Sequence, residues 1–396
     1  GAGAAAPARR LFRVSVRADC EGTAFHTADC AWFHFRVSGA LRRGEQLEFQ
    51  VGFGAAGRRS LTLRRLLADG LRPVVRSLPS SPDWRAVSGR CGLCALGDGT
   101  LALAFGHTVA GCREGEALYF ASCFPYTLEM LGGFLGSLEG QMRQAGIYMH
   151  RERLCDSLQG LPIELVTVTD AGGQSRQRQP PIAGLARHRG QRPHVFPGRR
   201  AVFVSARAHP GETPSSYVLE GLLGALAGGG GGGREMCELL KRYVFFFMPM
   251  LNPDGVALGH HRTDSRGVNL NRVYGTADTL NHPSIFAAAS ACLVAHQCQG
   301  GVRLYLDLHA HSTRRGAFVL GAEAKKPSTM AHMRLYCYAL ARRCPMFEYA
   351  QCTFGSRAEG TGLSMMSGRL DGGLCFTLET NYCRGHYAAE PFAPGH

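Results

Sequence analysis

The segment His-Pro-Gly-Glu places an imidazole and a carboxylate three residues apart, at His209 and Glu212. An apolar run typical of a buried strand precedes it from residue 201, and apolar residues at helical spacing follow from residue 216 to 227. Two histidines and one glutamate form an established ligand set of catalytic zinc sites, so this strand-to-helix junction offers two of three ligands. A surface histidine beside a helix-capping glutamate is the commoner interpretation of such a pair taken alone.

A third ligand should stand at the end of another strand, and the segment LYLDLHAHS provides His309 and His311. Because alternate strand residues share a face, both histidines lie on the face of Asp307, and their spacing leaves the choice between them open. We prefer His309 as the ligand of a single zinc ion per chain. Asp307 and the other histidine are then expected to orient the ligands.

Two further segments carry groups that hydrolysis would use. Glu379 lies inside the apolar strand FTLETNY, where desolvation would raise its pKa toward the range useful for a general base. The segment HRTDSRGVNLNR contains Arg262, Asn271 and Arg272. Arginine side chains bind carboxylates through two parallel hydrogen bonds, although most arginine-rich segments are solvated loops.

The composition narrows the class of protein and of partner. A chain of 396 residues with 45% hydrophobic and 19% charged residues is ordinary for a soluble protein of one large or two smaller domains. The net charge of +14 favours an acidic partner. Basic residues form no run and no stripe interleaved with aromatic residues, so we expect no nucleic-acid partner. No apolar run is long enough to cross a bilayer, and we expect no membrane partner.

Cysteine usage and the first residues point to a reducing compartment. The start lacks the apolar stretch of a secretory signal, and the 15 cysteines show no repeated spacing, so we expect reduced thiols in a cytoplasmic protein. The pair Cys91 and Cys94 has the spacing of a zinc or redox motif but lacks a second pair nearby. We therefore expect no function for it.

The distribution of strand and helix patterns predicts two domains. Residues 9–117 contain short β-rich runs separated by turns, which predicts an antiparallel β-sandwich. Over residues 118–396 strand patterns alternate with helical ones, near 127–143, 215–227, 283–297 and 328–343. The predicted fold class is therefore α/β, with a mixed sheet flanked by helices and preceded by the sandwich.

Several blocks taken together resemble a known family, the cytosolic carboxypeptidases, a branch of the zinc carboxypeptidases that trims glutamates from tubulin and other acidic tails. The matching blocks are HPGETPSS, NPDGV, HRTDSRGVNLNR, DLHAHSTRRG and FTLETNY, with WFHFRVSG and CFPYTLEML upstream. The resemblance covers about residues 15 to 385 and is closest to the branch that removes branch-point glutamates. It implies polyglutamylated tubulin or other acidic tails as partners, in the cytoplasm, with microtubule or cilium association.

Carried over block by block, the resemblance implies a role for each candidate residue. His209, Glu212 and His309 look like the three zinc ligands, and Glu379 looks like the general base.

The same blocks imply the residues that bind substrate. Arg262 resembles the arginine that polarises the scissile carbonyl, and Asn271 and Arg272 resemble the pair that holds the terminal carboxylate. An enzyme with these contacts is an exopeptidase.

The segment from 359 to 373 departs from the family pattern. Relatives usually carry an arginine, tied to selection of an acidic side chain, where Leu363 stands, and an aromatic residue near Ser367. Arg357 and Arg369 are the neighbouring residues that could replace that arginine. Relatives also continue into a further helix, whereas this sequence stops 17 residues after Glu379, so we expect the catalytic domain of residues 118–396 to lack its C-terminal helix.

Two alternative functions remain open. One is an N-acyl amino acid deacylase of the aspartoacylase type, which has a similar zinc set but normally lacks the sandwich. The other is a catalytically impaired protein that binds tubulin tails, motivated by the altered 359–373 segment. Glu379 favours the hydrolase, because a binding protein needs no general base.

Overall fold

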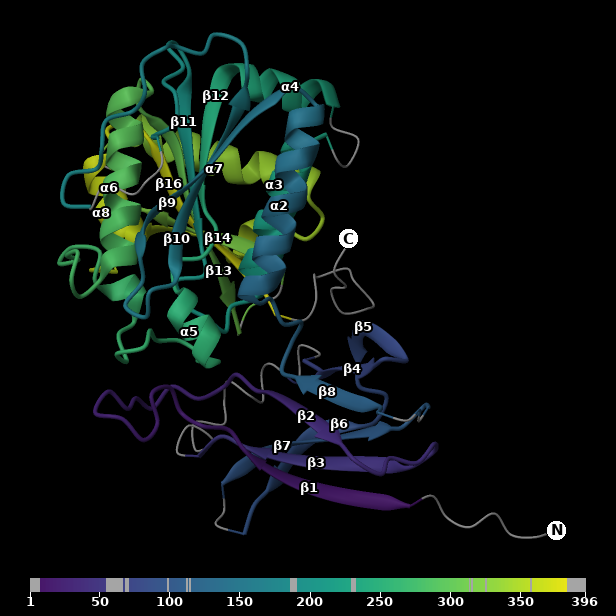
Figure 1. Cartoon of the computed structure of the whole chain (residues 1–396). Helices are drawn as coiled ribbons and strands as arrows, with labels where there is room; N and C mark the ends of the chain where they lie inside the picture. Colours follow the sequence, from purple (N-terminus) through teal and green to yellow (C-terminus); the bar gives the residue numbers. More distant parts are fainter. Residues whose placement is uncertain are drawn as a thin grey trace.

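The computed structural model describes residues 8–54, 67, 71–97, 100–111, 113, 115–185, 191–228, 233–312, 314, 316–324, 326–356 and 358–382. These residues form an N-terminal pair of four-stranded sheets and a C-terminal α/β part built on an eight-stranded sheet. The two parts lie one against the other (Figure 1). The predicted fold class is confirmed.

The N-terminal sheets pack as a sandwich. One has the order β1-β3-β7-β6 and the other β2-β8-β4-β5. In chain order the strands are β1 (Arg9–Ser15), β2 (His34–Ser38), β3 (Gln46–Gly52), β4 (Val74–Leu78), β5 (Ser81–Ala86), β6 (Cys91–Ala95), β7 (Leu101–Thr108) and β8 (Ala117–Ala121). Since β8 pairs with β2 and β4, this sheet extends to Ala121, past the predicted division after residue 117.

One strand pair of the sandwich departs from the antiparallel prediction. The pairs are antiparallel except β1 with β3, which run parallel. The chain enters the opposite sheet as β2 between them, so it returns in its original direction. Packed phenylalanines fill the space between the sheets: the ring centroid of Phe49 lies 4.9 Å from that of Phe105 and 4.6 Å from that of Phe120.

The C-terminal sheet has the strand order β15-β14-β16-β13-β11-β12-β10-β9. Strands β12, β11, β13 and β16 are mutually parallel, and β10 and β14 run antiparallel to their inner neighbours. In chain order the strands are β9 (Ile147–Asp156), β10 (Pro162–Asp170), β11 (Arg200–Ala206), β12 (Tyr243–Met248), β13 (Val302–His311), β14 (Ala317–Ala322), β15 (Thr353–Ser356) and β16 (Leu374–Asn381).

Helices cover both faces of this sheet (Figure 1). Buried side chains of α2 (Leu128–Gln144), α3 (Pro214–Leu226) and α7 (Pro327–Arg343) share one apolar cluster with the sheet. Those of α6 (Pro283–Cys298) and α8 (Gly362–Arg369) share the cluster on the other face. The remaining helices are α4 (Gly233–Arg242), α5 (Pro253–Leu258), η2 (Leu270–Arg272) and η3 (Tyr349–Gln351).

The parallel strands direct their carboxyl ends toward one edge of the sheet. In open α/β sheets ligands bind at this edge, where the connections to the helices diverge. The chain leaves β11 at Ala206 just before His209, while His309 and Glu379 lie near the ends of β13 and β16. The topology therefore brings together the three segments that carry the predicted ligands and base.

Among the described residues, no cysteine forms a disulfide and none belongs to a group of potential metal ligands. All described cysteines are free thiols. Cys91 and Cys94 lie on β6, and neither belongs to a group of potential metal ligands among the described residues. No helix within the described ranges combines the length and apolarity needed to cross a bilayer.

Candidate active site

The turn that carries His209 and Glu212 is held by a buried arginine. Arg207 has a positive φ of 61° and is 1% exposed. Its guanidinium donates to the carbonyl oxygen of Pro210 at 2.6 Å and to Ser216 Oγ at 2.9 Å. Because these acceptors lie within the turn and in the first turn of α3, Arg207 fixes the turn against the helix that follows.

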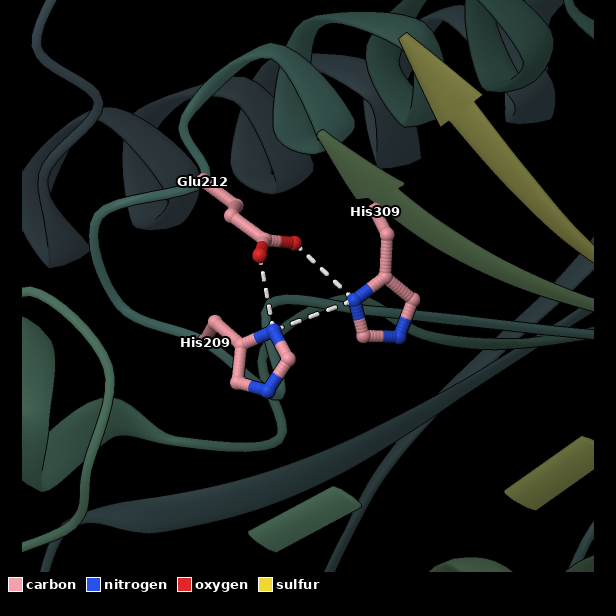
Figure 2. A group of neighbouring side chains, drawn as sticks. All are labelled: His209, Glu212 and His309. Carbon is pink, nitrogen blue, oxygen red and sulfur yellow. Dashed lines mark hydrogen bonds and ion pairs between the residues drawn. The ribbon is translucent and has the colours of Figure 1, made fainter. Parts of the chain in front are cut away.

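His209, Glu212 and His309 converge on one point (Figure 2). Nδ1 of His209 lies 2.8 Å from Glu212 Oε1, and Nδ1 of His309 lies 2.9 Å from Glu212 Oε2. The two Nδ1 atoms are 3.2 Å apart. All three side chains are buried, so they form a compact cluster of two nitrogen ligands and one carboxylate.

The opposite nitrogen of each ring is held by a separate acceptor. His209 Nε2 lies 3.0 Å from Asn269 Oδ1, and His309 Nε2 lies 2.9 Å from Asp307 Oδ2. These contacts aim both Nδ1 atoms at Glu212, and Ser205 Oγ in turn donates to Asp307 at 2.7 Å. His309, the histidine preferred from the sequence, lies in this cluster, and His311 does not. The structure also adds Asn269, which sequence reasoning missed.

The electrostatics of the cluster suit a cation. Burial opposes a charged imidazole, but the carboxylates of Asp307 and Glu212 outweigh it and raise the pKa of His309 well above its ordinary value. Burial also opposes ionisation of Glu212, but His209 and His309 hold the pKa of that carboxyl well below its usual range. The carboxylates thus stabilise positive charge where the three ligand atoms meet. Two imidazoles with one carboxylate match the preference of zinc, so the residues fit this ion.

Glu379 lies next to the cluster. It is paired in register with His309 across the parallel strands β13 and β16, so both side chains leave the sheet on the same face. Burial raises the pKa of Glu379 to about 7. Its Oε2 atom is buried and has no hydrogen-bond partner among the described residues. A carboxyl group in this state can exchange a proton near neutral pH.

The other three predicted residues, Arg262, Asn271 and Arg272, line the same pocket of about 400 Å³ as the cluster and Glu379. Asn271 Oδ1 accepts from the backbone N–H of Gly362 at 3.0 Å, which ties the η2 segment to α8. Burial and the neighbouring Arg262 lower the pKa of Arg272, so two guanidinium groups act on one region of the pocket. The structure therefore brings all seven predicted residues together around a space that favours an anion.

The segment with the departures forms one wall of this pocket. Leu363, on α8, lines the pocket and is 3% exposed. Ser367 Oγ donates to the carbonyl oxygen of Ser364, and Ser367 is not a lining residue. Arg369, at the exposed end of α8, does not line the pocket either, and Arg357 lies outside the described residues.

The sandwich also contributes to the pocket. Ala31, Trp32 and Leu71 lie in its lining together with residues of the α/β part. A ligand in this pocket would therefore contact both parts of the molecule.

Comparisons with known proteins point to the zinc carboxypeptidases. The sequence profile of the family described as zinc carboxypeptidase matches residues 139–329, just under half of the chain. It is 28% identical over 484 residues to human cytosolic carboxypeptidase-like protein 5, covering 94% of this chain and 53% of the human protein. It is also 28% identical over 375 residues to human cytosolic carboxypeptidase 6, with 91% and 67% covered.

A solved structure supports the fold over nearly the whole chain. The metallo-carboxypeptidase from Burkholderia cenocepacia superposes with a TM-score of 0.70 at 24% identity, covering 93% of this chain and 84% of that one. By contrast, the chain spans about half the length of the curated carboxypeptidase-like protein 5 relatives that it matches.

Proposed function

We propose that this protein is a zinc-dependent carboxypeptidase. The observation that carries the proposal is the convergence of His209, Glu212 and His309, with Glu379 beside them, whose Oε2 has no hydrogen-bond partner among the described residues. One metal ligand set, one general base and an anion-favouring pocket are what hydrolysis at a free carboxyl terminus requires. We propose one Zn²⁺ per chain, held by these three residues.

Zinc bound there would supply Lewis-acid activation of water and of the scissile carbonyl. Glu379 takes the proton of the attacking water and delivers it to the leaving amine, which a carboxyl with a pKa near neutrality can do in both directions. Arg262 donates to the carbonyl oxygen as negative charge develops on it. Asn271 and Arg272 hold the terminal carboxylate of the substrate and so place the last peptide bond at the base.

For the substrate, we propose the C-terminal or branch-point glutamates of polyglutamylated proteins such as tubulin. The proposal is supported by the similarity to cytosolic carboxypeptidases, by the net charge of +14 and by the two arginines in the pocket. A basic protein attracts acidic tails over distances of about a Debye length. The same similarity supports a cytoplasmic location, with association to microtubules or cilia.

The test is zinc-dependent release of glutamate from a synthetic peptide that ends in several glutamates. The purified chain, loaded with one equivalent of zinc, should release glutamate, and a chelator should abolish the release until zinc is restored. Metal analysis should give about one zinc per chain. Absence of zinc-dependent release from every peptide would reject the carboxypeptidase and favour the catalytically impaired tail-binding protein.

Parallel substrates decide selectivity, because the pocket is lined by the apolar side chain of Leu363 as well as by arginines. Peptides ending in glutamate, branch-point glutamate or alanine should be cleaved with the glutamate-ended ones preferred. Equal or faster cleavage of the alanine-ended peptide would retain the carboxypeptidase and reject the glutamate specificity. Hydrolysis of acetyl-aspartate without peptide cleavage would favour the deacylase.

A further inference from the structure

The loop of the sandwich that follows β1 contains a buried carboxylate that faces the α/β part. Asp19 is 2% exposed and accepts four hydrogen bonds from the segment that carries Arg262. Its Oδ1 accepts from the backbone N–H of His261 at 2.6 Å, and its Oδ2 accepts from those of Arg262 and Thr263 at 2.7 and 2.8 Å. Oδ2 also accepts from Thr263 Oγ1 at 3.1 Å.

Asp19 is itself held by the loop in which it lies. Its backbone N–H donates to the carbonyl oxygen of Asp29 at 2.8 Å, and its own carbonyl accepts from Thr27 at 3.1 Å. The next residue, Cys20, donates its backbone N–H to His260 Nε2 at 3.3 Å. The carboxylate is therefore a fixed anchor rather than a mobile surface group.

The anchored segment connects to both halves of the proposed chemistry. Arg262 lines the pocket, and the carbonyl oxygen of its neighbour His261 accepts from the backbone N–H of Gly211 at 2.9 Å, within the turn of His209 and Glu212. Three consecutive backbone N–H groups bound to one carboxylate fix the path of the chain on either side of Arg262. A shift of about 1 Å in a group that acts on the transition state can cost about 100-fold in rate.

We propose that Asp19 is a positioning residue of the active site, through which the sandwich holds Arg262 in the direction required to stabilise the developing oxyanion. This inference rests on the proposed role of Arg262. The sandwich is then part of the catalytic unit, because the backbone N–H groups from His261 to Thr263 donate to a carboxylate that lies in the sandwich.

The experiment is a double-mutant cycle between Asp19→Asn and Arg262→Ala in the full chain. Asparagine keeps the size of the side chain but replaces one carboxylate oxygen with an NH₂ group, which cannot accept hydrogen bonds from the backbone N–H groups of the segment. If Asp19 acts through Arg262, Asp19→Asn should lower kcat/KM by about 10- to 100-fold, mainly through kcat, and by no more than about 2-fold when Arg262 is already alanine. Equal losses in both backgrounds, or no loss, would overturn the proposal.

Glu116→Gln provides a matched control. Glu116 is a carboxylate of the sandwich that is also buried, at 4% exposed, and it accepts hydrogen bonds from Ser77 and Ser80 away from the pocket. The Glu116→Gln substitution should lower the stability of the sandwich without changing kcat. If the Asp19→Asn variant does not fold, Thr263→Val can be used instead, because it removes only one of the four hydrogen bonds. We expect it to lower kcat by about 3-fold, and we expect this loss to disappear when Arg262 is alanine. Additive losses would contradict the proposal.

Hydrogen exchange gives a readout that does not depend on activity. In the metal-free protein, the amides of His261, Arg262 and Thr263 should exchange at least about 10-fold faster in Asp19→Asn than in the unaltered chain or in Glu116→Gln. Unchanged exchange would overturn the anchoring. If the unaltered protein released no amino acid from any peptide, the proposed function would fail, and the exchange data would still decide whether Asp19 holds the segment.

Discussion

Glu379 combines burial, an unpartnered oxygen and a pKa near 7 at a single position beside the ligand cluster. Replacing its carboxyl with an amide removes the proton acceptor while keeping the shape of the side chain. We expect Glu379→Gln to lower kcat by about 100- to 10,000-fold with little change in KM, measured as peptide cleavage by the zinc-loaded protein.

The zinc content separates this result from a damaged metal site. The amide variant should still bind about one zinc per chain, and Glu164→Gln, on β10 and outside the pocket, should keep full activity. An active Glu379→Gln variant would assign proton transfer to another group.

Asn269 is a residue whose importance only the structure reveals. Its Oδ1 lies 3.0 Å from His209 Nε2 and thereby keeps Nδ1 directed at the cluster. We expect Asn269→Ala to weaken zinc binding by about 10- to 100-fold, measured by competition with a chromogenic chelator. Asn281→Ala, in an exposed loop, is the control, and equal zinc affinity in the two variants would show that His209 needs no such partner.

The candidate site residues could be predicted because each stands out from its local sequence pattern. Polar ligands after apolar strands, as at His309, and a glutamate inside an apolar strand, as at Glu379, are rare without a role. Asp19 and Asn269 do not stand out in this way. Each acts through a contact with a residue more than 50 positions away, and ordinary loops contain aspartate and asparagine at similar density.

At the scale of elements, Gly211 makes the turn of His209 and the segment of Arg262 interdependent. A Cβ atom at this position would lie 2.8 Å from the carbonyl oxygen of His261, closer than such atoms approach. We expect Gly211→Ala to separate the two segments, which should weaken zinc binding and lower kcat/KM by about 10-fold or more.

The matched substitution is Gly132→Ala on α2, where a Cβ atom would meet nothing within 4 Å. Alanine there should stabilise the helix by about 1 kcal/mol and leave zinc binding unchanged, as measured by thermal unfolding and metal titration. If Gly211→Ala behaved like Gly132→Ala, the close contact would have no functional consequence.

The long elements of the α/β part were predictable and the short or mixed ones were not. The helices predicted near 127–143, 215–227, 283–297 and 328–343 correspond to α2, α3, α6 and α7, since each has an apolar face or a buried apolar sequence. Strand β9 was missed because IYMHRERLCD carries charged residues at the sheet edge, where one face is solvated. Strand β6, the Cys91 segment, shows no alternation of buried and exposed residues that would mark it as a strand.

At the scale of the whole molecule, a buried histidine makes the sandwich sensitive to acid. His107, on β7, is 5% exposed, and burial followed by the charge of Arg85 lowers its pKa to about 4. In the unfolded chain an imidazole takes up its proton near pH 6.5, so between these values the unfolded state binds more protons than the folded one. The contribution of neutral His107 to the free energy of unfolding is therefore fully present above about pH 6.5. As the pH falls toward 4, the free energy of unfolding should decrease by up to about 3 kcal/mol.

Both tryptophans of the chain, Trp32 and Trp84, belong to the sandwich, so their fluorescence reports on the unfolding of this part. Urea unfolding monitored by tryptophan fluorescence from pH 4.5 to 7.5 should show a shallower loss of stability in His107→Gln than in the unaltered protein. The control is His26→Gln, which replaces an exposed histidine of the same part. Identical slopes in all three proteins would assign the acid sensitivity to other groups.

The position of β16 constrains when the protein becomes competent during synthesis. This strand lies between β13 and β14, so β14 and β15 have no place in the sheet until β16 has inserted, although both are made earlier. The strand also carries Glu379, 170 positions after His209. A nascent chain still holding this segment inside the ribosome would therefore have the proposed metal ligands but not the proposed base, so we expect no hydrolysis until translation of this strand is complete.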